Sequence, residues 1–182
     1  MRPTRVDLSQ SQTTDQEKNM DLSTADLYDQ FGDTVQSVSI QFQDLGGEQA
    51  FSGPIRTVKC YHDNVVLKSV LSTPGAGAVL VVDGGGSLER ALMGDMIAEI
   101  AVKNGWNGVI INGAIRDRAV LAGLPLGVKA LGSNPRKSVK NGVGEIDVPV
   151  AIGGVIFTPG GTVYADTDGI LVAGPAMEPL DM

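Results

Sequence analysis

The pattern of apolar and polar residues separates a polar start from a long region with regular secondary-structure periods. Residues 1–22 are polar and show no hydrophobic period, which is typical of segments that bury too little surface to fold. Regular periods begin at residue 23. We therefore expect a disordered tail over 1–22, a single domain over 23–176 and a C-terminal tail over 177–182.

Apolar residues at a spacing of three and four predict three helices. The first lies within 23–32, and the second starts at Asp63 or Asn64 and stops at the Thr-Pro-Gly sequence of 73–75. The third lies within 94–105. We expect its apolar stripe to consist of Met93, Met96, Ile97, Ile100 and Ala101.

Strands are predicted where apolar residues alternate with polar ones or form short continuous runs. The segment 55–61 alternates, whereas 78–82 and 109–111 are apolar throughout, as is typical of buried strands. Further strands are expected over 35–40, 148–152, 155–157, 162–164 and 169–172. The order of elements predicts a mixed α/β domain with a strand-rich C-terminal part.

Composition narrows the classes of function. Hydrophobic residues make up 42% of the chain and charged residues 19%, as in globular proteins. The net charge of −7 argues against direct nucleic-acid binding, although a small anion can still bind at a local positive site. The single cysteine, Cys60, excludes an intramolecular disulfide. Apolar runs are too short for a signal sequence or a membrane span, so we expect a cytoplasmic protein.

The most informative motif is Gly94-Asp95, followed after twenty residues by Arg116-Asp117. A helix of about ten residues rises about 15 Å from Gly94, and a strand of about five residues returns about 16 Å. Helix start and strand end are therefore expected at one edge of the sheet, where open α/β sheets usually bind ligands.

This edge would gather free backbone N–H groups at the helix start, the guanidinium of Arg116 and the carboxylate of Asp117. The N–H groups are those of Asp95, Met96 and Ile97. Each part has a structural alternative: Asp95 as an ordinary helix cap, and Arg116 with Asp117 as a surface ion pair. Sequence alone leaves both interpretations open.

Several motifs in the same order resemble the family named for regulator of ribonuclease activity A, which also contains the metal-dependent 4-hydroxy-4-methyl-2-oxoglutarate aldolases. The resemblance spans roughly residues 26–172. Its motifs are Gly94-Asp95 with Arg116-Asp117, and the segments 53–55, 57–60, 81–87, 104–108 and 164–170.

The resemblance implies an αββα-type sandwich, a swivelling β/β/α-like single domain, assembled as a homotrimer or hexamer with the site near a subunit boundary. It implies that substrate is held by Gly94, Asp95, Met96, Ile97 and Arg116, and that Asp117 holds a divalent metal ion largely through water. The chain departs from the pattern at Val120, where some of the aldolases carry an acidic residue.

The residue types fit a lyase that acts on short 2-oxo diacids. Retro-aldol cleavage of 4-hydroxy-4-methyl-2-oxoglutarate, or decarboxylation of oxaloacetate, leaves a pyruvate enolate whose charge needs stabilisation. A hard cation such as Mg²⁺ or Mn²⁺ and the guanidinium of Arg116 are suited to this, with Arg116 and Asp117 as the catalytic residues. The alternative is a protein-binding regulator that inhibits a ribonuclease without catalysis.

Other signals are interpreted as structural. The Asp-Gly-Gly-Gly-Ser sequence of 83–87 lacks the spacing of a nucleotide or S-adenosylmethionine loop, so we interpret it as a tight turn and set a methyltransferase aside. His62 is expected to be exposed or capping, and Cys60 to pack as a small apolar residue. The basic group of Arg136, Lys137 and Lys140 is interpreted as a solvated face, and Asp166 and Asp168 as turn residues.

Overall fold

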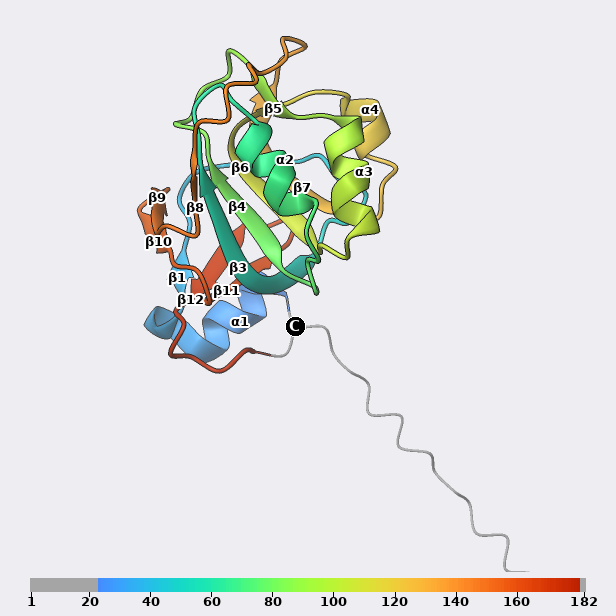
Figure 1. The fold of residues 1–182 in the computed structure, drawn as a ribbon. Coiled ribbons are helices and arrows are strands. Elements are labelled where there is room, and N and C mark those ends of the chain that lie inside the picture. The colour runs from blue at the N-terminus through green and yellow to red at the C-terminus, as the bar shows by residue number, and fades with distance from the viewer. Residues whose placement is uncertain (1–22, 181–182) are drawn as a thin grey trace, which may run out of the picture.

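A computed structural model describes residues 23–180, so the predicted tail over 1–22 lies outside the described residues. The helices are α1 (Thr24–Phe31), the 3₁₀ helix η1 (Gly32–Thr34), α2 (Val65–Leu71), α3 (Asp95–Lys103) and α4 (Arg118–Leu121) (Figure 1). The strands are β1 (Gln36–Ser37), β2 (Gln43–Asp44), β3 (Phe51–Lys59), β4 (Val79–Asp83), β5 (Ala91–Met93), β6 (Gly108–Ile115), β7 (Gly127–Ser133), β8 (Glu145–Ile146), β9 (Val150–Ile152), β10 (Val155–Phe157), β11 (Thr162–Ala165) and β12 (Ile170–Ala173).

The centre of the fold is a parallel sheet of β3, β4, β6 and β7, and β5 runs parallel to the end of β6. Buried residues alternate between its two faces, as the pleat requires. In β4, Leu80 and Val82 pack with side chains of α2 and α3, whereas Val79 and Val81 pack with side chains of β9 to β12. The strand β4 is therefore apolar throughout because both of its faces are covered.

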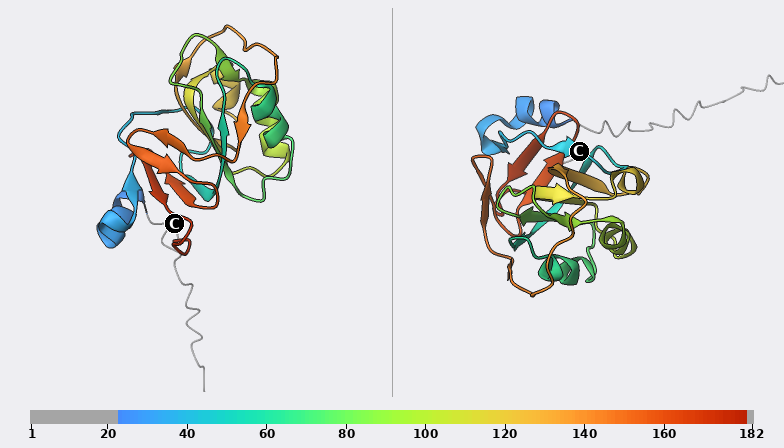
Figure 2. Two further views of the ribbon diagram at one scale, coloured as in Figure 1. Left: turned by 60° about the vertical axis from the view of Figure 1, so that its left-hand side comes forward. Right: turned by 90° about the horizontal axis from the view of Figure 1, so that it is seen from above.

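The strands β11 and β12 form a second layer and carry a helix on their outer face. Val163 and Val172 point to the parallel strands, whereas Tyr164 and Leu171 pack against Leu27 of α1. Figure 2 shows α1 on one side of the molecule and the helices α2 and α3 on the opposite side. The order helix, strands, strands, helix confirms the predicted αββα-type mixed α/β fold.

Some local predictions differ from the structure. The strand expected over 35–40 is limited to β1 (Gln36–Ser37). Met93 lies in β5 instead of the third helix, and Met96 is 71% exposed, so neither belongs to the helical stripe. No strand is predicted over 127–133, yet β7 occupies it, because the buried Lys129 breaks the apolar run. Its amine is 2.5 Å from a carboxylate oxygen of Asp44, which satisfies the buried charge.

Part of the predicted C-terminal tail packs on the domain. Met177 and Leu180 pack against the apolar cluster that includes Leu27 of α1, and the Leu180 N–H donates a hydrogen bond to the Tyr164 hydroxyl. Within residues 23–180, no helix is long and apolar enough to cross a membrane.

Candidate active site

The two halves of the predicted motif lie side by side because β5 and β6 are neighbouring parallel strands. Met93 is paired with Ile115, and the Arg116 N–H donates to the Met93 carbonyl at 2.9 Å. The chain then turns into α3 after Gly94, and into α4 after Asp117. Gly94-Asp95 and Arg116-Asp117 are therefore brought together at the carboxyl ends of two strands, where ligands bind in open α/β sheets.

Gly94 is required by the lack of space between the two halves. A Cβ atom at this position would lie 2.5 Å from Oδ2 of Asp117 and 3.1 Å from Cγ of Arg116. Both distances are shorter than ordinary van der Waals contacts. A larger residue would therefore push Arg116 and Asp117 away from the start of α3.

Asp117 has a strained backbone and a carboxylate that turns toward α3. Its φ of 59° and ψ of 40° lie in the left-handed region, which is uncommon outside glycine and recurs at functional sites. Oδ2 accepts a hydrogen bond from the Asp95 N–H at 3.2 Å and lies 3.5 Å from Nε of Arg116.

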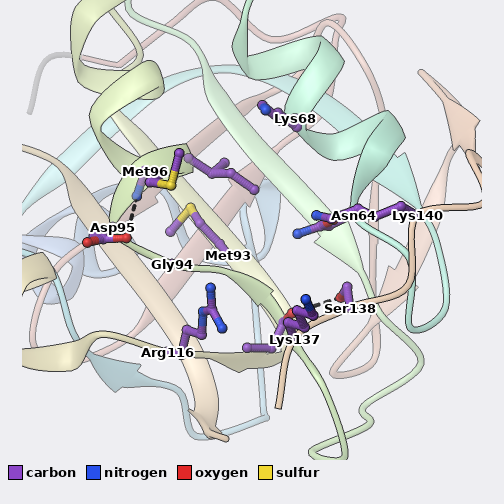
Figure 3. Close-up of a pocket in the computed structure, with 12 residues that line it drawn as sticks. Asn64, Lys68, Met93, Gly94, Asp95, Met96, Arg116, Lys137, Ser138 and Lys140 are labelled. Atoms are coloured by element: carbon purple, nitrogen blue, oxygen red, sulfur yellow. Dashed lines mark hydrogen bonds between the residues drawn. The ribbon is translucent and has the colours of Figure 1, made fainter. Parts of the chain in front are cut away.

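The N–H groups at the start of α3 are less available than expected. The Asp95 N–H is bound by Asp117, and the Met96 N–H donates to Oδ1 of Asp95 at 2.7 Å (Figure 3). The expectation that both are free is therefore wrong. Carboxylates near a helix start compete with a ligand for these donors.

A pocket with a volume of about 280 Å³ opens beside this motif. Five predicted residues line it: Gly94, Asp95, Met96, Ile97 and Arg116. Sequence patterns did not assign its other lining residues to the site; these are Asn64, Lys68, Ala91, Met93, Lys137, Ser138 and Lys140. In Figure 3, Arg116 and Lys68 lie on opposite sides of the pocket, and Asn64 and Lys140 lie together at a third side.

Asp117 does not line this pocket. It lines an adjacent hollow together with Arg116, Arg118, Ser133, Asn134 and Pro135. Arg116 lines both hollows, and its Nε lies 3.5 Å from Oδ2 of Asp117.

Lys137 and Lys140 are exposed, as expected of a solvated face, and both also line the pocket. The segment 134–143 folds back over β5: the Ala91 N–H donates to the Arg136 carbonyl at 2.8 Å, and the Ser138 hydroxyl donates to the Ala91 carbonyl at 2.7 Å. The sequence signal for this part of the pocket is the presence of three cationic residues within positions 136–140, in a chain that is acidic overall.

Four cationic side chains make the pocket electropositive in a chain of net charge −7: Lys68, Arg116, Lys137 and Lys140. Asp95 is the one acidic residue of the lining. The pKa of Lys140 is lowered from its ordinary value by partial burial, and also by the charges of Lys68, Arg116 and Lys137. The amine of Lys140 donates to Oδ1 of Asn64. A small anion would relieve the repulsion among these cations.

The donors near Asp117 fit one type of metal ion. Among residues 23–180, no group of three or more His, Cys, Asp or Glu side chains is arranged to hold a metal. Asp117 lines a hollow that Ser133 and Asn134 also line. A single carboxylate suits Mg²⁺ or Mn²⁺, which keep several waters and take further oxygen ligands from the substrate, and it does not suit a Zn²⁺ site.

The remaining sequence signals are structural. Oδ1 of Asp83 accepts hydrogen bonds from the Gly85 N–H and from Nδ2 of Asn112, which closes the glycine-rich turn. Burial, aided by Asp63 and Asp83, raises the pKa of the Cys60 thiol to about 12, so this cysteine is unreactive. His62 lies 2.7 Å from the Ser87 hydroxyl.

The fold and the pocket together define the class: a mixed α/β sandwich with a small cationic pocket at the carboxyl ends of parallel strands. The chain belongs to the Aldolase/RraA family, because the RraA-like model of that family matches residues 24–172. The resemblance noted from the sequence motifs is thereby confirmed.

Three solved structures are similar over most of the chain. A Geobacillus kaustophilus HTA426 protein, named S-adenosylmethionine:2-dimethylmenaquinone methyltransferase, has 51% identity and a TM-score of 0.82 over 84% of this chain and 94% of its own. The RNA-processing inhibitor RraA from Thermus thermophilus has 41% identity and a TM-score of 0.83 over 88% and 96%. Streptomyces coelicolor RraAS2, described as an unusual member of the RNase ES inhibitor RraA family, has 29% identity and a TM-score of 0.72 over 85% and 82%.

Proposed function

We propose that this protein is a divalent-metal-dependent lyase that forms pyruvate from a short 2-oxo diacid. The substrate is oxaloacetate, by decarboxylation, or 4-hydroxy-4-methyl-2-oxoglutarate, by retro-aldol cleavage. The observation that carries the proposal is that Arg116 pairs with the carboxylate of Asp117 and also lines a pocket with three lysines.

The pocket supports a small dianionic substrate. Its volume of about 280 Å³ lies near the lower end of the usual range for ligand sites. A 2-oxo diacid carries two carboxylates, and the lining offers Arg116 on one side and Lys68, Lys137 and Lys140 elsewhere. We place the 2-oxo acid end at Arg116 and the turn of Gly94 to Ile97, and the distal carboxylate at the lysines.

The chemistry requires stabilisation of the charge on a pyruvate enolate. In this proposal Asp117 would hold, largely through water, Mg²⁺ or Mn²⁺, which would supply Lewis-acid chemistry at the 2-oxo group. The guanidinium of Arg116 donates hydrogen bonds to the oxygen on which negative charge develops. The Gly94 turn holds Arg116 and Asp117 together, so the donor is in place before charge develops.

Decarboxylation is the simpler of the two reactions for this chain. Retro-aldol cleavage also needs a base that removes the hydroxyl proton, whereas decarboxylation does not. Val120 stands where some of the aldolases carry an acidic residue, and its side chain is 45% exposed. We therefore rank oxaloacetate first.

Pyruvate release, coupled to lactate dehydrogenase, tests the proposal. We expect turnover above the metal-only background with Mg²⁺ or Mn²⁺, loss of turnover in EDTA and recovery when metal is restored. A Schiff-base lyase using Lys140 would instead survive EDTA and be inactivated by borohydride in the presence of substrate. Absence of pyruvate from both substrates would contradict the lyase proposal.

The second candidate function is inhibition of a ribonuclease by direct binding. It is favoured by the Thermus thermophilus relative, which is named an RNA-processing inhibitor and has 41% identity to this chain. Binding of a partner surface needs no metal, so inhibition should persist in EDTA and in Asp117→Asn. A pull-down with purified ribonuclease that yields no complex at micromolar concentration would count against it.

We also propose a homotrimer or hexamer, as the family resemblance implies. Light scattering should give three or six times the chain mass of 18.9 kDa. A monomer would exclude any site shared between subunits.

A further inference from the structure

Asp63 is a buried carboxylate that lies outside the lining of the pocket. Only 2% of its surface is exposed. Oδ1 accepts a hydrogen bond from the Val65 N–H at 3.0 Å. Oδ2 accepts from the Asn141 N–H at 2.8 Å and from the Val143 N–H at 3.2 Å. Burial opposes the charge, but these backbone bonds hold the pKa of Asp63 below its usual value, so the group is ionised at neutral pH.

These hydrogen bonds join two segments that are far apart in the sequence. Val65 begins α2, whereas Asn141 and Val143 belong to the irregular segment between β7 and β8. The same segment is fixed at a second point, where the Val139 N–H donates to the His62 carbonyl at 2.8 Å. Asp63 therefore holds an otherwise irregular segment against the start of α2.

The segment held in this way carries a wall of the pocket. Lys137, Ser138 and Lys140 all line the pocket and all lie between β7 and β8. Lys140 immediately precedes Asn141, whose N–H makes the shortest hydrogen bond to Asp63. The position of the Lys140 amine thus depends on a bond made by the adjacent residue.

Asn64, the neighbour of Asp63, extends the connection to the Gly94 turn. Its Oδ1 accepts a hydrogen bond from the Lys140 amine, and its Nδ2 donates to the Leu92 carbonyl at 3.0 Å. Leu92 lies in β5, two residues before Gly94. Asp63 and Asn64 therefore hold the segment with Lys137 and Lys140 in a fixed position relative to the turn at Gly94.

We propose that Asp63 is a positioning residue, whose buried carboxylate holds the 137–143 segment so that Lys137 and Lys140 face the anion in the pocket. The inference rests on the proposed function for its kinetic readout, but the geometry of the segment can be tested without catalysis. Removal of the carboxylate would leave the N–H groups of Asn141 and Val143 without their acceptor, and the segment would lose its anchor.

The test compares Asp63→Ala and Asp63→Asn with Asp166→Ala. Asp166 is a matched control because its carboxylate also anchors a distant segment: it accepts hydrogen bonds from the Thr24 N–H and hydroxyl, both at 2.7 Å, at the start of α1. Both alanine variants should lower the melting temperature. Only Asp63→Ala should raise KM for oxaloacetate, by about tenfold, while kcat changes less. Asp63→Asn, which keeps one oxygen acceptor, should lie between Asp63→Ala and the wild type.

Two readouts are independent of turnover. Amide hydrogen exchange should become faster at Asn141 and Val143 in Asp63→Ala and stay unchanged there in Asp166→Ala. Amine-directed labelling, followed by peptide mapping, should show faster modification of Lys140 only in the Asp63 variants.

Failure of the inference and failure of the proposed function are distinguishable. If the wild type releases no pyruvate, the lyase proposal fails, and exchange and labelling still decide the role of Asp63. Unchanged exchange at Asn141 and Val143 in Asp63→Ala would overturn the positioning role. So would an equal rise of KM in Asp63→Ala and Asp166→Ala. If Asp63→Ala does not fold, Asp63→Asn is measured in the same way, and wild-type exchange and labelling in that variant would overturn the role.

Discussion

Oδ2 of Asp117 accepts a hydrogen bond from the backbone N–H of Asp95 at 3.2 Å, across 22 positions of the sequence. This contact joins the end of β6 to the start of α3. It also orients the Asp117 carboxylate beside the guanidinium of Arg116, whose Nε lies 3.5 Å away. The Gly-Asp and Arg-Asp motifs are therefore parts of one structural unit. A substitution that displaces one motif should also displace the other.

Gly94→Ala should disrupt this unit through volume alone. The new Cβ would meet Oδ2 of Asp117 at 2.5 Å, so the Arg-Asp pair or the start of α3 must move. We expect a fall in kcat/KM of about 100-fold, because displacement by about 1 Å has effects of this size. Gly174→Ala is the control, since a Cβ there meets no atom within 4 Å. Equal kinetics for the two variants would show that the contact at Gly94 is irrelevant to activity.

Asp117→Asn should weaken activation by metal and preserve the fold. Asparagine tolerates the left-handed backbone, and its side-chain oxygen can still accept from the Asp95 N–H. The Mg²⁺ concentration for half-maximal turnover should rise about tenfold or more, and excess Mg²⁺ should partly restore activity. Asp147→Asn is matched, because Asp147 also has positive φ, of 55°, and pairs with an arginine. Identical Mg²⁺ titrations of the two variants would show that Asp117 does not bind the metal ion.

Lys140→Met should weaken substrate binding and change stability little. The pKa of Lys140 is lowered in the folded protein, first by burial and then by the charge of Lys68, so its charged form is disfavoured there. Loss of this charge should raise KM for oxaloacetate about tenfold. Relief of the disfavoured charge and loss of the hydrogen bond to the buried Asn64 act in opposite directions on the free energy of unfolding at neutral pH. Lys103→Met, at the exposed end of α3, should leave KM unchanged. An unchanged KM in Lys140→Met would place the distal carboxylate elsewhere.

Much of the fold is predictable from sequence because burial on two faces leaves a clear signal. The continuous apolar run of β4 and the capped start of α1 follow local rules, and both are found where expected. β7 is not predicted because its buried Lys129 looks like a surface residue in the sequence. The partner that satisfies its charge, Asp44, lies 85 positions away. For the same reason, the place of Lys137 and Lys140 in the pocket is not predicted, since their segment is held by long-range bonds to Asp63, His62 and Ala91. Local patterns identify the Gly-Asp and Arg-Asp motifs, whereas the opposite wall of the pocket depends on tertiary contacts.

The docking of α1 should depend on pH through Asp166. Burial opposes its charge, but hydrogen bonds from Thr24 hold the pKa of Asp166 below its usual value. The stability it provides is therefore complete above about pH 4, the unfolded pKa, and is lost as the pH falls through the lower folded pKa. Asp166→Asn should lower the urea midpoint at pH 7 by an amount that shrinks as the pH falls below about 4. Asp168→Asn, at an exposed position of the same turn, should leave the midpoint unchanged at each pH. A midpoint difference that is constant with pH would contradict this role.

The turnover of Arg116→Ala, measured beside Arg56→Ala, tests the central claim most directly. The two arginines form ion pairs with similar side-chain exposure, 41% and 36% for Arg116 and Asp117 against 36% and 41% for Arg56 and Asp147. Only Arg116 lines the pocket. If Arg116 stabilises the enolate, Arg116→Ala should lose about 10² to 10³ in kcat for metal-dependent pyruvate release, while its stability falls by less than about 1 kcal/mol. Arg56→Ala should keep wild-type turnover. Wild-type turnover in Arg116→Ala would contradict the claim and leave the pair with Asp117 as a surface ion pair.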